Sequence, residues 1–234
     1  MCGRFSIAVR IGYLAERFGV HEPPGISLPR FNIAPGEEVP VITGNERAQV
    51  VMMHWGLIPS RIRGEKPAQA PVNARAEALN ENKLFRPLLL HGRCVVPATG
   101  FYEWKKSGNQ KSPYYFRMKT QEIFSMAGLC NSREAPDGRM VWSFTIITTG
   151  PNSLVTPIHN RMPAILIRED EKKWLCPDCD ISEGLATMLN PYPPENMMAY
   201  RVTKMVNKPS FKSKATVQEE NPGATNDLFA WDTR

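Results

Sequence analysis

The chain has 234 residues, of which 42% are hydrophobic and 22% are charged, and these values are typical of a globular protein. Lysine and arginine exceed aspartate and glutamate by 29 − 23 = 6, a modest positive balance that permits a phosphate-rich partner without requiring one. No apolar run approaches the ~20 residues that span a bilayer, and no signal-peptide pattern is present, so we expect a cytoplasmic protein without a membrane partner.

The first part of the chain alternates short regular segments with connections rich in Pro and Gly. A short amphipathic helix is expected over residues 13–18, where Gly19 ends it. Irregular connections are expected over residues 21–36 and 56–71. The remaining elements of this part are strands over residues 39–43 and 48–55 and helices over residues 75–80 and 83–90.

A β-rich region follows, in which turn sequences such as Pro136-Asp137-Gly138 separate the strands. Strands are expected over residues 94–96, 100–105, 114–118, 123–129, 140–149, 164–167 and 198–202, and helices over residues 170–175 and 182–189. This succession predicts the α+β class, with a mainly antiparallel sheet or small barrel as the core and helices flanking it. We expect a single domain over residues 1–210 and a polar, loosely packed tail over residues 211–234.

The five cysteines are an odd number, which argues against a disulfide framework in an intracellular protein. Cys176-Pro177-Asp178-Cys179 has the spacing of half a zinc site, and His91-x-x-Cys94 is the one spaced candidate for the other half. Because that second pair leads into a predicted strand, we expect no metal site.

Cys2 becomes the N-terminal residue once Met1 is removed, and its small side chain favours that removal. The product is a 1,2-aminothiol, whose amine titrates near pH ~8 and whose thiol titrates near pH ~8.5. An aldehyde forms a Schiff base with such an amine, and the thiol then closes a five-membered thiazolidine ring intramolecularly. The alternative is that the residue at position 2 is arbitrary.

Two side chains are candidates for proton transfer. Glu103 lies in an expected strand among Phe101, Tyr102 and Trp104, where burial would raise its pKa toward neutrality. Alternation places Phe101 and Glu103 on the same side, so the pattern leaves open a position on the solvated face. His159 lies in a loop bounded by prolines, and its alternative is a plain surface group.

Other polar and aromatic residues are candidates for binding. Guanidinium groups hold phosphate through two hydrogen bonds, or they form structural ion pairs, and the candidates are Arg4, Arg75 and Arg161. Asn73 either caps the following helix or orients a substrate or the Cys2 amine. Trp104 offers a stacking surface for a base, whereas core packing is the more plausible role of Trp55.

Six segments, taken together and in this order, resemble the SRAP (SOS response-associated peptidase) family. They are Met1-Cys2-Gly3-Arg4-Phe5, Asn32-Ile33-Ala34-Pro35, Trp55-Gly56-Leu57-Ile58-Pro59, Asn73-Ala74-Arg75-Ala76-Glu77, Phe101-Tyr102-Glu103-Trp104 and His159-x-Arg161-Met162-Pro163. Val206-Asn207 is similar to the closing element of the family. No single segment is specific, but the ordered set is.

The resemblance implies a protein that crosslinks itself to abasic sites in single-stranded DNA and shields them. By this analogy Cys2 supplies both nucleophiles, and His159 is the general acid at the sugar ring oxygen. Glu103 shuttles protons during Schiff-base formation and ring closure, and Asn73 orients the amine and the sugar. No cofactor or metal is required.

The resemblance also implies DNA contacts. Arg4 and Arg75 would hold the flanking phosphates, with Arg161 and Trp104 as further contacts. We expect a monomer that associates with the nucleoid when bound to DNA. Where many relatives have tryptophans after the Trp-Gly-Leu-Ile-Pro segment, this chain has Ser60-Arg61-Ile62-Arg63, which predicts a steeper salt dependence of DNA binding. Asn160 stands where relatives often have Asp.

Two other functions are alternatives. A thiol peptidase would use Cys2 as the nucleophile and His159 as the base, and the removal of Met1 by the protein itself belongs to this activity. A non-enzymatic nucleic-acid binding module would rely on the charge of +6. Thiazolidine chemistry requires the free amine of Cys2, which neither alternative needs.

Overall fold

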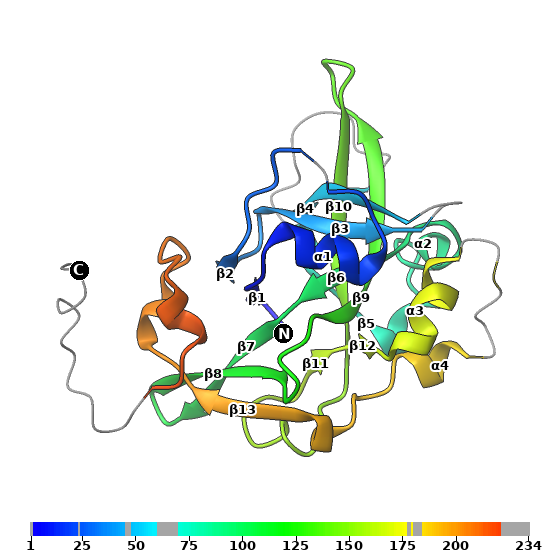
Figure 1. Cartoon of the computed structure of the whole chain (residues 1–234). Coiled ribbons are helices and arrows are strands. Elements are labelled where there is room, and N and C mark those ends of the chain that lie inside the picture. The colour runs from blue at the N-terminus through cyan, green and yellow to red at the C-terminus, as the bar shows by residue number, and fades with distance from the viewer. Residues whose placement is uncertain are drawn as a thin grey trace.

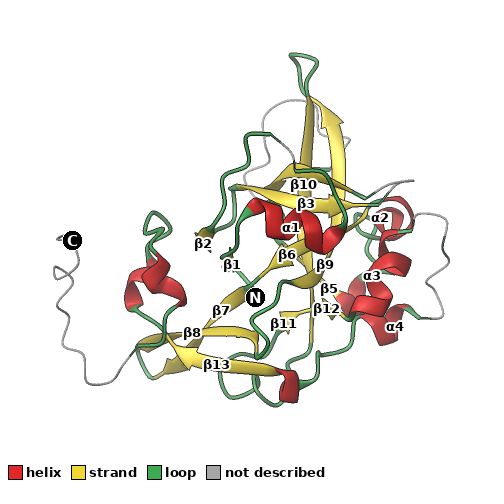
Figure 2. Cartoon of the chain, in the orientation of Figure 1, coloured by secondary structure: helices red, strands yellow, loops and turns green. Residues whose placement is uncertain are grey.

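A computed structural model of the whole chain describes residues 2–22, 24–44, 48–59, 70–176, 179 and 184–220. A small closed barrel and a second, five-stranded sheet make up most of these residues, with short helices around them (Figure 1, Figure 2). This architecture confirms the α+β class, the mainly antiparallel core and the single domain that the sequence predicts.

Five strands close the barrel, because β9 pairs with β10 as well as with β6. The strands are β3 (Glu38–Thr43), β4 (Gln49–Trp55), β6 (Arg93–Ala98), β9 (Phe124–Glu134) and β10 (Met140–Thr149). Neighbouring strands are antiparallel except β10 and β4. Short strands extend the barrel, namely β5 (Asn73–Arg75) and β11 (Met162–Pro163) on β10 and β12 (Ile165–Leu166) on β9. The β9–β10 hairpin projects beyond it at the top of Figure 1.

The second sheet is antiparallel throughout and has the order β13–β8–β7–β1–β2. Its strands are β1 (Phe5–Ile7), β2 (Arg30–Ile33), β7 (Gly100–Ser107), β8 (Gln110–Met118) and β13 (Met197–Arg201). The irregular connection predicted over residues 21–36 is therefore wrong at β2, which forms because Phe5 and Ile7 pair with it. The first strand, β1, thus lies inside this sheet, between β7 and β2.

Aromatic side chains fill the region between the barrel and the second sheet. Trp55 is fully buried, and its ring lies 5.0 Å from that of Phe5 and 6.2 Å from that of Phe144. Its indole N–H donates to the Val72 carbonyl at 2.9 Å. Trp55 is therefore a core residue. A smaller apolar cluster lies on the second sheet and consists of Tyr102, Tyr115, Val202 and Val206.

The helices are short and flank the strands. They are α1 (Ile11–Phe18), α2 (Arg86–His91), α3 (Arg168–Leu175) and α4 (Leu185–Met188), and the last three lie on one side of the molecule in Figure 2. Gly19 ends α1 with φ at 62°, as the sequence predicts, because glycine adopts this left-handed backbone readily. The helix predicted over residues 75–80 is largely wrong: β5 occupies its start and a single 3-10 turn, η1 (Ala76–Ala78), follows, because β5 pairs with β10.

The chain after β13 packs back onto the second sheet. Two 3-10 turns lie in this segment, η3 (Lys204–Asn207) and η4 (Lys214–Val217), and a third, η2 (Pro194–Asn196), precedes β13. Thr216 is fully buried, and its hydroxyl donates to the Phe31 carbonyl at 3.1 Å. Thr216 thus anchors this segment to β2, while most of residues 211–220 are exposed, and the loose packing of the tail stays a prediction. Residues 221–234 lie outside the described part, and the boundary at residue 210 stays a prediction.

Cys176 and Cys179 form a local disulfide at the end of α3, with their Cα atoms 5.3 Å apart. The sequence argues against a disulfide framework and offers this pair as half of a zinc site, whereas here the two sulfurs are bonded to each other and the Cys179 N–H donates to the Cys176 carbonyl at 3.3 Å. The described residues contain no cluster of three or more side chains suited to a metal. Over the same residues, no helix has the length and apolar character needed to cross a membrane.

Candidate active site

Cys2 lies just before β1 and is fully buried. The side chain of Asn73 reaches it from β5, where Nδ2 donates to the Cys2 carbonyl at 3.0 Å. The pairing of Asn73 with Ile146 of β10 holds β5 in register. Within the described part of the chain, the buried Oδ1 atom of Asn73 has no hydrogen-bond partner. Asn73 caps no helix, because Arg75 is the residue that precedes η1.

Glu103 is buried in β7, with 2% of its surface exposed. Both faces of this strand are covered here, because Phe101 packs in the main core and Tyr102 packs in the smaller cluster. Glu103 shares the side of Phe101. The structure thus decides between the two positions that the sequence leaves open. Burial raises the pKa of Glu103 from its usual 4.5 to about 8, so most of this carboxyl is protonated at pH 7.

His159 faces this carboxyl from the loop that precedes β11. Its Nε2 atom lies 3.8 Å from Oε2 of Glu103, and its side chain is 24% exposed against 3% for Glu103. The main-chain N–H of His159 donates to the Val155 carbonyl, and Oδ1 of Asn152 accepts from the N–H of Val155. This turn fixes the start of the loop. Burial lowers the pKa of His159 below its ordinary value.

The same carboxyl also acts on Cys2. Burial, and then the charge of Glu103, raise the pKa of the Cys2 thiol well above its usual value. The structure therefore gathers four residues from distant segments into one site: Cys2, Asn73, Glu103 and His159. These are the residues that the sequence predicts as catalytic, and their roles stay a prediction.

Arg4 and Trp104 form a second cluster on the same sheet. The guanidinium carbon of Arg4 lies 5.9 Å from the Trp104 ring centroid, a cation–π arrangement. Nη1 of Arg4 donates to Oδ1 of Asn32 and to the Val206 carbonyl, both at 2.8 Å. The Trp104 indole N–H donates to Oδ1 of Asn207 at 2.7 Å. The η3 turn therefore holds both side chains.

The other two arginines differ in their surroundings. Arg75 is exposed, and alternation along β5 places it on the side of Asn73. Arg161 instead forms an ion pair with Glu77, in which two nitrogen–oxygen distances are 2.7 Å and 2.9 Å. Both of its terminal nitrogens are thus occupied by groups of this protein.

Sequence reasoning assigned no role to two residues that support these clusters. Asn32 is fully buried, accepts from Arg4 and donates through Nδ2 to the carbonyls of Val206, Lys208 and Phe211. The sequence signal that could have identified Asn32 is its position as a polar residue inside the short apolar stretch of residues 31–34. Glu77 is the partner of Arg161, and nothing in its local sequence identifies so distant a contact.

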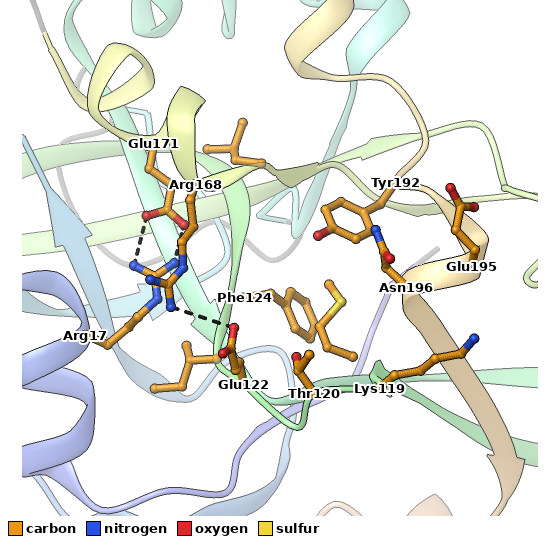
Figure 3. Close-up of a pocket in the computed structure, with 13 residues that line it drawn as sticks. Arg17, Lys119, Thr120, Glu122, Phe124, Arg168, Glu171, Tyr192, Glu195 and Asn196 are labelled. Carbon is orange, nitrogen blue, oxygen red and sulfur yellow. Dashed lines mark hydrogen bonds and ion pairs between the residues drawn. The ribbon is translucent and has the colours of Figure 1, made fainter.

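A separate cleft, with a volume of about 220 Å³, lies beside α1 and α3 (Figure 3). Four of its charged side chains form two ion pairs, Arg17 with Glu171 at 2.6 Å and Arg168 with Glu122 at 3.7 Å. None of the predicted site residues lines this cleft. The basic stretch Ser60-Arg61-Ile62-Arg63 lies outside the described residues.

Known proteins resemble this chain over most of its length. The family model "SOS response associated peptidase (SRAP)" matches residues 1–209. Abasic site processing protein YoqW of Bacillus subtilis (strain 168) is 37% identical over 222 residues, which cover 93% of this chain and 99% of that protein. Abasic site processing protein YedK of Escherichia coli (strain K12) is 33% identical over 184 residues, which cover 75% and 79% of the two chains. A crystal structure of a protein from Bacteroides thetaiotaomicron has a TM-score of 0.84 at 32% identity, and covers 94% of this chain and 100% of its own. This chain belongs to the SOS response-associated peptidase family.

Proposed function

We propose that this protein recognises abasic sites in single-stranded DNA and forms a thiazolidine crosslink with them through Cys2, after Met1 is removed. The observation that carries the proposal is the meeting of Cys2 with Asn73, Glu103 and His159. These residues supply an aminothiol, an amide and two proton carriers. The relatives named above, which are abasic site processing proteins, support the same substrate.

The first step is opening of the closed sugar. An abasic deoxyribose is mostly a hemiacetal, and its ring opens when O4′ gains a proton from Nε2 of protonated His159 while a water molecule takes the proton of the hydroxyl on C1′. The Arg161 main chain presents an N–H at 3.1 Å and a carbonyl at 3.2 Å to Nδ1 of His159, and we expect the neutral ring to accept from the N–H and to carry its own proton on Nε2. His159 is the more exposed of the two proton carriers, so it is the group we expect at O4′.

The second step joins protein to sugar. The Cys2 amine attacks C1′ of the aldehyde, and the resulting carbinolamine loses water when Glu103 donates a proton to its hydroxyl. The thiol then adds to the iminium carbon, and its proton returns to the Glu103 carboxylate. One water is released in total, and the ring contains Sγ, C1′, N, Cα and Cβ. A carboxyl with a pKa of about 8 suits both directions of transfer near neutral pH.

The remaining residues position the substrate. Oδ1 of Asn73, buried beside Cys2, is an acceptor suited to an amine hydrogen. We expect Arg4 and Arg75 to contact the flanking phosphates and Trp104 to stack on a base, with Arg161 acting closer to His159. The partner is single-stranded DNA that contains an abasic site, and the protein acts as a monomer without a cofactor.

The electrostatics disfavour a thiol peptidase. Such an enzyme works through a thiolate, which a neighbouring cationic histidine stabilises. Here burial and the charge of Glu103 raise the pKa of the Cys2 thiol, and burial lowers the pKa of His159. Addition of a neutral thiol to an iminium, with transfer of its proton to Glu103, does not need a standing thiolate.

A denaturing gel tests the proposal. Protein whose mass shows the loss of Met1 is mixed with a single-stranded oligonucleotide that carries one abasic site, and the sample is heated in detergent. The expected result is a shifted band. The adduct in this band has the mass of the protein plus the oligonucleotide minus one water. No adduct from this protein would refute the proposal.

A variant distinguishes the bond that the Cys2 amine forms with C1′ from the bond that the Cys2 thiol forms. Cys2→Ser keeps the amine but lacks the thiol, so we expect no heat-stable adduct and a Schiff base that borohydride traps. An oligonucleotide without the lesion is the matched DNA control. A simple binding module would instead bind both oligonucleotides reversibly and would be indifferent to Cys2→Ser.

A further inference from the structure

Glu77 connects the segment that carries Asn73 with the loop that carries His159. It lies in η1, directly after β5, and its two carboxylate oxygens accept from Nη1 and Nη2 of Arg161 at 2.7 Å and 2.9 Å. This geometry, with two parallel hydrogen bonds, is the strongest form of an Arg–carboxylate pair. The hydrogen bonds lower the pKa of Glu77, so it is ionised at neutral pH.

Arg161 is the buried member of the pair. Its side chain is 17% exposed against 58% for Glu77, and Nη2 also donates to the Thr148 carbonyl at 2.5 Å. Thr148 lies on β10 beside β5 and β11. A guanidinium held this deeply needs a counter-ion, because leaving a mostly buried charge unpaired is costly. Glu77 is the carboxylate that supplies it.

The main chain of Arg161 in turn serves His159 in both of its protonation states. The Arg161 N–H lies 3.1 Å from Nδ1 of His159, and the Arg161 carbonyl lies 3.2 Å from the same atom. The N–H donates to Nδ1 when the ring is neutral, and the carbonyl accepts from Nδ1–H when the ring is protonated. A ring held this way keeps Nε2 directed at Glu103 while it gains or loses a proton.

We infer that Glu77 is a positioning residue, which clamps Arg161 and through the Arg161 main chain sets the orientation and tautomer of His159. This inference rests on the proposed function, because it assigns Glu77 to the proton transfer at the sugar. It also means that the Arg161 guanidinium is paired with Glu77 before DNA binds and is not available to hold a phosphate.

Crosslinking rates test the clamp. We expect Glu77→Ala to slow the rate constant at saturating oligonucleotide about tenfold, since small displacements of a reacting group cost up to about 100-fold. Glu77→Gln keeps one acceptor and should fall in between. Glu81→Ala removes an equal charge from an exposed position four residues later and should leave the rate unchanged. Thermal unfolding of each variant shows whether the fold is kept.

A double-mutant comparison shows through which residue Glu77 acts. If Glu77 works through Arg161, adding Glu77→Ala to Arg161→Ala causes no further loss of rate. Additive losses overturn the inference. The inference is also overturned if the Glu77→Ala protein binds DNA more tightly and its rate constant at saturating oligonucleotide is unchanged. Arg161 would then be a phosphate ligand that Glu77 blocks.

A DNA-free measurement keeps this inference separate from the proposed function. The ¹⁵N chemical shifts of the His159 imidazole report its tautomer, and we expect the Nε2–H form in the unaltered protein and a mixed population in Glu77→Ala. If the unaltered protein forms no adduct but the shifts change as expected, the proposed function fails and the clamp stands. Identical shifts in both proteins refute the clamp.

Discussion

The buried carboxyl of Glu103 is expected to make the folded protein less stable as pH rises. Burial raises the pKa of Glu103 from 4.5 to about 8 in the folded state, so the folded protein holds this proton more tightly than the unfolded chain. The corresponding stability is fully present below pH 4.5 and is lost as pH rises through about 8. Glu103→Gln keeps the shape and removes the ionisation.

The size of the effect follows from the shift. One pKa unit corresponds to about 1.4 kcal/mol, so the stability that the folded protein loses through Glu103, relative to acid pH, is about 1 kcal/mol at pH 5 and about 3 kcal/mol at pH 7. It approaches about 5 kcal/mol above pH 8. The free energy of unfolding of Glu103→Gln should therefore exceed that of the unaltered protein by an amount that grows by about 1 kcal/mol per pH unit from pH 5 to pH 8.

Urea unfolding of both proteins at pH 5, 6, 7 and 8 measures this difference. Groups that titrate in both proteins, such as exposed carboxylates, largely cancel, so the difference isolates Glu103. Parallel curves would show that Glu103 is ionised at little cost, and the assignment of this residue as a proton donor would lose its basis. The variant should also crosslink slowly, because an amide cannot supply the proton.

Three further substitutions test packing and hydrogen bonding in different parts of the fold. Asn32→Ala removes the hydrogen bonds to Arg4 and the η3 region, and we expect it to lower the free energy of unfolding by about 3 kcal/mol in urea unfolding and to speed proteolysis after Val202. Glu171→Gln leaves the buried Arg17 without its carboxylate and should cost about 3 kcal/mol in the same assay. Gly100→Ala places a Cβ 2.2 Å from the Tyr115 ring and should lower the melting temperature by several degrees, because backbone or ring must shift.

The sequence pattern was sufficient to predict an element where residues close in sequence also determine its structure. The strand predicted over residues 140–149 matches β10, because the turn at residues 136–138 returns it onto β9. The helix predicted to end before Gly19 corresponds to α1, because a glycine in the left-handed conformation ends a helix locally. Short connections also account for the antiparallel pairs β3–β4, β7–β8 and β9–β10.

Pairing across long separations was not predictable from one sequence. β2 forms within a Pro-rich stretch because β1 pairs with it, and β5 replaces the start of a predicted helix because β10 lies alongside. The same limit applies to the site. The residue types of Cys2, Glu103 and His159 indicate their chemistry, but the burial of Glu103 depends on the C-terminal segment and the barrel covering both faces of β7.

Arg4 donates to the carbonyl of Val206, which lies 202 positions later in the sequence. During synthesis, Cys2 and Arg4 are therefore made long before the η3 segment that holds Arg4 and Trp104. A nascent chain that has not reached η3 carries Cys2 without the ordered surroundings of the finished site. Synthesis of η3, as well as removal of Met1, is thus needed before this site is assembled.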